Sequence, residues 1–138
     1  MNISLERWLN LNNLENEEWK RILNFEDKYL ISNYGRVKSI IFNTKILRPR
    51  IDKKGYIHYA LKKNGKTKEM KAHRLVALHF IPNFYNKLQV NHIDGNKQNN
   101  NANNLEWCTN GENQKHSYII KPNRGNVFRY NNPNKKIK

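Results

Sequence analysis

The chain has 138 residues, with 26 lysines and arginines against 11 aspartates and glutamates, which gives a formal net charge of +15. A positive field of this strength favours a polyanionic partner, and a chain of this length can bury a core of its own. The single cysteine, Cys108, excludes an internal disulfide and a Cys-rich zinc cluster, and neither a signal peptide nor an unbroken membrane-spanning run is recognisable.

The first part of the chain is predicted to form a short helix followed by strands. Within residues 3–15 the apolar side chains have near-helical spacing, and residues 17–22 are expected to form an irregular turn. Residues 29–32 and 36–41 are predicted strands on either side of a turn, in which Gly35 supplies a positive φ angle.

A second β-rich unit follows. Residues 46–51 are predicted to form an edge strand, because Pro49 cannot donate a hydrogen bond to a neighbouring strand. Apolar and polar residues alternate over residues 56–62, which is typical of a half-buried strand. Asn64-Gly65 then predicts a tight hairpin that leads into a further strand.

The exposed side of these strands and their turns is rich in basic residues. Because a two-stranded ribbon fits the major groove, we expect this surface to contact DNA. A solvated strand face in a lysine-rich protein is the alternative interpretation. The expected DNA contacts in this half of the chain are Arg36, Lys38, Arg48, Arg50, Lys62, Lys63, Lys66 and Lys68.

Residues 71–81 are predicted to form a helix with an apolar stripe, which Pro82 ends. His73 and His79 lie six residues apart in this helix, so they do not share a face and make a poor pair of metal ligands. We interpret both histidines as structural groups.

Residues 88–116 have the pattern of a strand, a loop, a second strand and a helix. Asp94-Gly95 ends the first strand with turn-forming residues. Thr109 followed three residues later by Glu112 indicates a capping box at the start of the helix. In this arrangement a histidine on the first strand can face a side-chain oxygen in the first turn of the helix, across a gap that accepts a hydrated cation and a phosphate.

This segment resembles the ββα-metal nuclease core of the HNH family, in the branch found in phage and intron-encoded homing endonucleases. His92, Asn104 and Asn113 match the three letters of its motif, with Asn in place of the final His. Residues 18–39 resemble the NUMOD-type DNA-binding motif that precedes such cores, and residues 72–81 resemble the helix that joins the two.

The resemblance implies an α+β fold, in which an N-terminal antiparallel β-sheet module precedes a ββα-metal (HNH) nuclease core. We expect four segments along the chain. They are an N-terminal helical extension at residues 1–16, a basic β-rich DNA-binding module at 17–71, the linking helix and nuclease core at 72–120, and a basic tail at 121–138.

The resemblance also implies metal-dependent hydrolysis of DNA. His92 is the expected general base, because the pKa of a histidine lies near working pH, and one Mg²⁺ (or Mn²⁺) ion would act as the Lewis acid. Asn91 and Asn113 match the metal-ligand positions, and Asn104 is expected to pin the loop to the strand. Because relatives often carry aspartate where this chain has Asn91, Asp94 stays open as an alternative ligand.

Double-stranded DNA is the expected partner, bound by a monomer, without zinc and without a membrane. Lys97, Lys115 and His116 are expected to contact phosphates around the site. The expected location is the cytoplasm, on the nucleoid of a bacterial or phage-infected cell, without secretion.

Alternatives stay open at this stage. A DNA-binding regulator with a decayed, inactive nuclease core would account for Asn91, and an RNA-binding protein would account for the charge alone. His92 taken by itself is typical of a buried strand histidine bonded to a backbone carbonyl. Because 25 of the 138 residues are asparagine, as AT-rich coding favours, the run at residues 99–101 is given no functional weight.

Overall fold

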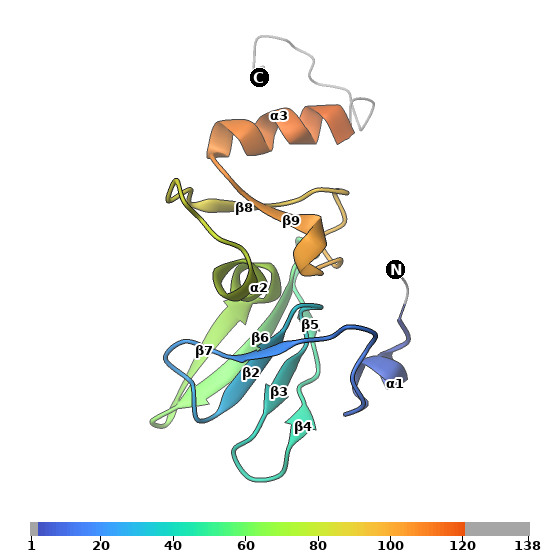
Figure 1. The fold of residues 1–138 in the computed structure, drawn as a ribbon, viewed down its shortest axis with the longest axis vertical. Coiled ribbons are helices and arrows are strands. Elements are labelled where there is room, and N and C mark those ends of the chain that lie inside the picture. Colours follow the sequence, from blue (N-terminus) through green and yellow to red (C-terminus); the bar gives the residue numbers. More distant parts are fainter. Residues whose placement is uncertain (1–2, 121–138) are drawn as a thin grey trace.

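The computed structural model describes residues 3–120 and the side chains of residues 3–115. Two antiparallel sheets form the lower part of the molecule in Figure 1, and helix α2 (Ala72–Phe80) crosses above them. A two-stranded hairpin and helix α3 (Asn110–Ile120) lie beyond α2 (Figure 1). This arrangement confirms the expected α+β fold. The predicted basic tail, residues 121–138, lies outside the described residues.

The first sheet contains β1 (Trp19–Arg21), β2 (Tyr29–Ser32), β3 (Val37–Ser39) and β4 (Lys45–Ile46), in that order. The turn between β2 and β3 uses Gly35 at φ +93°, as the sequence predicts. The prediction of an irregular turn at residues 17–22 is wrong, because β1 pairs with β2 along its whole length.

The second sheet contains β5 (Arg50–Ile51), β6 (Ile57–Lys63) and β7 (Lys66–Lys71). Asn64 and Gly65 both have positive φ angles, 52° and 75°, which is the hairpin geometry that their sequence predicts. The single predicted strand at residues 46–51 is wrong. Pro49 lies between β4 and β5, and these two short strands belong to different sheets.

Helix α2 is packed on two sides. It contacts β2, β6 and β7 of the sheets below it, and β8 (Gln89–His92) and β9 (Leu105–Cys108) above it. Leu75, Val76 and Ala77 are almost completely buried there. They join one hydrophobic core with Ala72 of the same helix and with residues in or next to all three sheets, namely Ile22, Phe25, Tyr29, Ile31, Val37, Ile57, Tyr59, Leu61, Val90 and Leu105.

Local capping determines where the outer helices begin. The Thr109 amide donates to Glu112 at 2.9 Å and the Glu112 amide donates to the Thr109 hydroxyl at 3.1 Å, so the predicted capping box is confirmed. At the N-terminus the helix is shorter than predicted, since α1 covers only Leu5–Trp8. A 3₁₀ turn, η1 (Ala102–Asn104), precedes β9.

The side chain of Arg36 is completely buried, and the prediction that it contacts DNA is therefore wrong. Its guanidinium donates to both carboxylate oxygens of Glu17 and to three backbone carbonyls, those of Trp8, Asn10 and Asn12. All five N–H donors of Arg36 are thereby used. This group fastens the N-terminal segment to the first sheet.

Burial alone would raise the pKa of Glu17, but hydrogen bonds from Arg36 and from the Leu14 amide outweigh it and hold the pKa below the ordinary value of 4.5. A carboxylate with a lowered pKa stabilises the fold above its ordinary pKa, and this contribution is lost as the pH falls through the lowered value.

We predict that Arg36→Met lowers the free energy of unfolding by about 3–5 kcal/mol, because it leaves the Glu17 carboxylate buried without its cation. Urea unfolding at pH 7 measures the loss. Arg50→Ala is the control, because it breaks a pair whose side chains are 58% and 46% exposed, and it should cost about 1 kcal/mol or less.

The difference between wild type and Arg36→Met should shrink below pH 4.5, where Glu17 becomes protonated more readily in the variant. Equal losses in the two arginine variants at pH 7 would contradict the anchoring role of the buried pair.

Candidate functional site

His92 is the last residue of β8, and its side chain is buried. Its Nε2 lies 2.7 Å from Oδ1 of Asn100. Its ring centre lies 5.0 Å from that of His73 in α2 and 6.2 Å from that of Tyr56, which precedes β6. Three separate segments of the chain therefore hold this imidazole.

The bond to Asn100 determines which ring nitrogen is basic. An amide oxygen can only accept, so Nε2 carries the proton and Nδ1 keeps its lone pair. No hydrogen bond to Nδ1 is present within the described part of the chain, so its lone pair is available to a ligand. Burial lowers the pKa of His92, although the Asn100 bond and the charge of Asp94 act in the opposite direction. A neutral imidazole with an accessible lone pair is suited to accept a proton from water.

His73 has a different environment from the one expected. Its ring stacks on Tyr56 with 5.1 Å between centres, and it contacts His92 as well. Burial and the neighbouring His92 lower the pKa of His73 to about 3, so this ring is neutral. The spacing of residues within the helix could not reveal this contact, because His92 lies on a strand of another sheet.

Asn104 joins the two ends of the loop after β8. Its side-chain nitrogen donates to Oδ1 of Asp94 and to the Asn99 carbonyl, both at 2.9 Å, and its oxygen accepts from the Asp94 amide at 3.1 Å. These bonds pin the loop, which is the task that the sequence assigns to Asn104.

The asparagine run at residues 99–101, which has no functional weight as a sequence motif, takes part in the hydrogen bonds of the loop. Asn99 donates to the second oxygen of Asp94 at 2.9 Å, Asn100 holds His92, and Asn101 accepts from the Asn103 amide at the start of η1. Composition explains why asparagine is frequent here, but the hydrogen bonds show what each one does.

Asn91 and Asn113 belong to the other side of the hairpin. Val90 and Leu105 belong to the core beside α2, so the alternation of a strand turns Asn91 and its cross-strand partner Glu106 to the opposite face of the hairpin. Helix α3 lies on the far side of the hairpin from α2 (Figure 1). Asn91 is 6% exposed and donates to the Glu106 carboxylate at 2.9 Å. Asn113 is half-buried in α3, which packs against β8 and β9.

These side chains suit a hard divalent cation. The amide oxygens of Asn91 and Asn113 and the adjacent Glu106 carboxylate are all oxygen donors, which Mg²⁺ and Mn²⁺ prefer. Among the described residues no group of three or more His, Cys, Asp and Glu could hold a metal ion. Sequence analysis missed Glu106, although its place opposite Asn91 follows from pairing the two predicted strands.

Asp94, the alternative ligand, is already engaged. Its carboxylate accepts from the Asn96 amide and from the side chains of Asn99 and Asn104. Burial acts to raise the pKa of Asp94, but these hydrogen bonds hold it below its ordinary value. Asp94 therefore serves the loop, and this observation favours Asn91 as the ligand.

Two ammonium groups lie beside the histidine pair. Lys97 donates to the Lys54 carbonyl at 2.9 Å and its Nζ lies 4.8 Å from the ring centre of Tyr56, while Nζ of Lys71 lies 4.7 Å from the same ring. Of the other residues expected near the site, Lys115 is exposed on α3, and the side chain of His116 lies outside those described.

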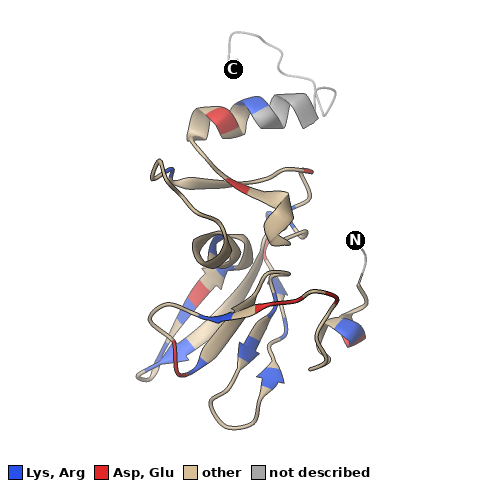
Figure 2. Ribbon diagram, in the orientation of Figure 1, with Lys and Arg blue, Asp and Glu red and all other residues tan. Residues whose placement is uncertain are grey.

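The strand register divides the predicted basic surface in two. Figure 2 shows lysine and arginine along the strands of both sheets. Lys62 lies on the same face of its sheet as His58 and Lys71, and this face leads to Tyr56. Lys68 pairs with the buried Leu61, on the opposite face.

Several of the predicted DNA contacts have partners within the chain. Arg50 pairs with Glu69 at 2.7 Å, Nζ of Lys38 lies 4.1 Å from the ring centre of Trp19, and Lys63 donates to the Asn24 carbonyl. Arg48 and Lys66 are exposed. The side chains that have partners within the chain are therefore less available to a ligand than the exposed Arg48 and Lys66.

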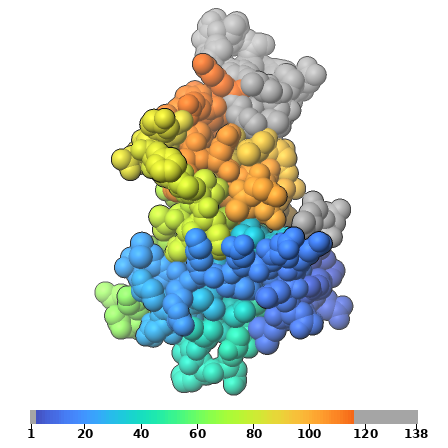
Figure 3. All heavy atoms as spheres, in the orientation of Figure 1, coloured from blue at the N-terminus to red at the C-terminus, as the bar shows by residue number. Residues whose placement is uncertain are grey.

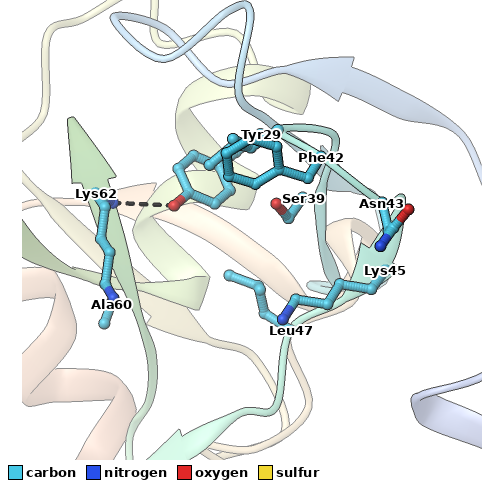
Figure 4. Close-up of a pocket in the computed structure, with 9 residues that line it drawn as sticks. Tyr29, Ser39, Phe42, Asn43, Lys45, Leu47, Ala60 and Lys62 are labelled. Atoms are coloured by element: carbon cyan, nitrogen blue, oxygen red, sulfur yellow. Dashed lines mark hydrogen bonds between the residues drawn. The ribbon is translucent and has the colours of Figure 1, made fainter. Parts of the chain in front are cut away.

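A hollow of about 450 Å³ lies between the two sheets, away from the histidine pair (Figure 4). It is lined by Tyr29, Ser39, Phe42, Leu47 and Lys62 among others, and the Tyr29 hydroxyl accepts from the Lys62 amide at 3.0 Å. No histidine or carboxylate lines it, so we do not place the chemistry there.

Comparison with known families assigns both halves of the chain. Residues 17–62 match the model of the NUMOD4 motif, and residues 70–115 match the model of the HNH endonuclease family. Residues 70–115 are therefore an HNH endonuclease segment, and residues 17–62 are a NUMOD4 segment. The HNH match contains His92, Asn104 and Asn113, and the NUMOD4 match covers β1 to β5 and most of β6.

Two proteins similar to this chain come from viruses. The chain is 47% identical over 100 residues to the DNA endonuclease I-HmuI of Bacillus phage SP01, a match that covers 70% of this chain and 57% of that protein. It is 49% identical over 90 residues to the uncharacterized HNH endonuclease L245 of Acanthamoeba polyphaga mimivirus, covering 65% of this chain and 27% of L245.

A solved structure supports the fold directly. This structure, of DNA binding and cleavage by the HNH homing endonuclease I-HmuI, matches with a TM-score of 0.69 and 42% identity, over 74% of this chain and 58% of the other. The chain thus spans a little over half of I-HmuI. None of its described helices is both long and apolar enough to cross a membrane.

Proposed function

We propose that this chain is a DNA endonuclease of the homing type, which hydrolyses phosphodiester bonds with one divalent cation and a histidine base. The observation that carries the proposal is the state of His92. Asn100 holds the ring in one tautomer, burial lowers the pKa of the ring, and Nδ1 keeps its lone pair. The likeness to I-HmuI, whose description names DNA cleavage, supports the same conclusion.

In this proposal Nδ1 of His92 accepts the proton of the water that attacks the phosphorus. The bond from Nε2 to Asn100 stabilises the imidazolium as it forms, because a charged donor makes a stronger hydrogen bond than a neutral one. His73, neutral at working pH, packs on the ring without adding a second positive charge beside it.

The cation would be held by Asn91 and Asn113, and Glu106 would add the carboxylate charge that Asn91 lacks. A bound Mg²⁺ or Mn²⁺ supplies Lewis-acid stabilisation of the phosphate and of the departing 3′ oxygen. Asn104 acts through the loop rather than on the substrate.

Double-stranded DNA would lie across the face that carries Lys62 and Lys71 and reach the histidine pair past Lys97. Glu69 stands between Lys62 and Lys71 on this face, and Arg50 and His58 pair with its carboxylate. Arg48 and Lys115, both exposed, would meet phosphates at its ends. Binding as a monomer, and a location on the nucleoid, stay predictions.

One observation favours a second candidate. Asn91 is uncharged, so the core could have lost its cation and kept only DNA binding. The carboxylate of Glu106 lies 2.9 Å from the Asn91 amide nitrogen. It weighs against this candidate because it puts a negative charge next to Asn91. The predictions below separate the two candidates.

We predict that His92→Ala lowers the rate of plasmid cleavage by about 10²–10⁴-fold and changes the DNA dissociation constant little, because a general base acts on the barrier rather than on binding. Cleavage and gel-shift titrations measure the two effects. His58→Ala, on the outer face of β6, should keep wild-type cleavage at saturating DNA. Parallel loss of binding and cleavage in His92→Ala would mean that the residue is structural.

We predict that Asn91→Asp lowers the Mg²⁺ concentration needed for half-maximal cleavage, because an anionic oxygen binds a hard ion more strongly than an amide oxygen. Without metal, the new carboxylate faces Glu106 and should lower the melting temperature, since like charges directly opposite on two strands repel. Added Mg²⁺ should restore that melting temperature.

Glu106→Gln is the matched variant and should shift the Mg²⁺ midpoint upwards. Identical midpoints in wild type and Asn91→Asp would remove Asn91 from the ligands. Absence of cleavage by the wild type at every Mg²⁺ concentration would support the binding protein with an inactive core.

We predict that Lys62→Ala reduces the slope of log affinity against log salt by about one unit and that Lys68→Ala does not, because each lost phosphate contact removes about one released counterion. The two lysines lie on opposite faces of one hairpin, which makes them a matched pair. Equal slopes for both variants would show that DNA does not use this face.

A further inference from the structure

Asn100 is the group that fixes His92, and it is itself tightly enclosed. Its side chain is 4% exposed, and its oxygen lies 2.7 Å from Nε2 of His92. A single hydrogen bond of this kind determines both the tautomer of the ring and its rotation about the side-chain bonds. The position of Asn100 therefore decides where Nδ1 points.

The turn at residues 33–35 of the NUMOD4 segment packs closely against Asn100. A Cβ atom built on Gly35 would lie 2.9 Å from Cβ of Asn100, which is closer than real Cβ contacts come. The Ala102 amide donates to the Asn33 carbonyl at 2.8 Å, and the Tyr59 hydroxyl donates to the Gly35 carbonyl at 2.8 Å. The turn at residues 33–35 is thus hydrogen-bonded both to the segment between β8 and β9 and to the second sheet.

We propose that Asn100 is a positioning residue for His92, and that the NUMOD4 turn at residues 33–35 holds Asn100 in place. The inference rests on the proposed nuclease function and deepens it. It gives the NUMOD4 segment a part in the chemical step in addition to any contact with DNA. Figure 3 shows the N-terminal sheet and the loop that precedes β9 as neighbouring parts of one surface.

The first test compares Asn100→Asp with Asn100→Leu. Aspartate keeps an acceptor oxygen of the same reach, whereas leucine has a similar size and no acceptor. We expect Asn100→Leu to lower kcat at saturating DNA by about 10²-fold with the dissociation constant unchanged, and Asn100→Asp to stay within about tenfold of wild type. Asn103→Leu, at an exposed neighbouring position, is the control and should cleave like wild type.

A second readout is independent of cleavage. The ¹⁵N chemical shifts of the His92 ring, measured by NMR without DNA, distinguish a protonated Nε2 from a protonated Nδ1. Wild type and Asn100→Asp should show the proton on Nε2, and Asn100→Leu should show a mixture of the two tautomers. A wild type with this signature that cuts no DNA would overturn the proposed function and leave the positioning by Asn100 supported.

The second test concerns the turn. Gly35→Ala must displace Asn100, so we expect kcat to fall by about tenfold or more with little change in DNA affinity. Gly65→Ala introduces a side chain at a similarly positive φ of +75°, but no atom lies within 4 Å of the new Cβ. It reproduces the backbone strain without the contact, and its kcat should match that of wild type.

Unchanged kcat and an unchanged His92 tautomer in Asn100→Leu would overturn the inference. So would equal effects of Gly35→Ala and Gly65→Ala on kcat, because the loss would then come from backbone strain alone. If Asn100→Leu does not fold, the tautomer and kcat of Asn100→Asp and Gly35→Ala decide the matter, and a wild-type result for Gly35→Ala in both would count against the proposal.

Discussion

The packing of α2 on both of its sides is the constraint on which the rest of the molecule depends. Its buried residues contact the two sheets below and the β8–β9 hairpin above, so one hydrophobic core runs through both family segments. This packing brings His73 against His92 and the turn at residues 33–35 against the loop that carries Asn100. Two units joined by a flexible linker would share none of these contacts.

The site is built largely from amides, in a chain with a net charge of +15. An amide can donate and accept at once, and Asn104 does both when it joins the ends of the loop. Because amides are uncharged, a site made of them offers little negative charge to a cation. On the proposed mechanism, Glu106 and the DNA phosphate supply it, which makes metal binding and DNA binding depend on each other.

Local chemistry made much of the fold predictable. The capping box at Thr109 and the hairpin at Asn64-Gly65 each need only neighbouring residues, and both were predicted. Contacts between distant residues were not predictable. Arg36 looked like a DNA contact because its partner Glu17 lies 19 residues away, and Asn100 looked like compositional bias because its bond to His92 depends on the folded loop. The three motif letters were found by resemblance, while the residues that hold them in place needed the structure.

We propose that this chain cuts DNA with a divalent cation. The most direct measurement incubates purified wild-type protein with supercoiled plasmid that carries a library of random inserts, in Mg²⁺ or in EDTA, with gel shifts of the same mixtures. We expect bound DNA in both buffers, and nicked or linear product in Mg²⁺ only. Bound DNA in both buffers, with no product at any Mg²⁺ concentration, would contradict the proposal.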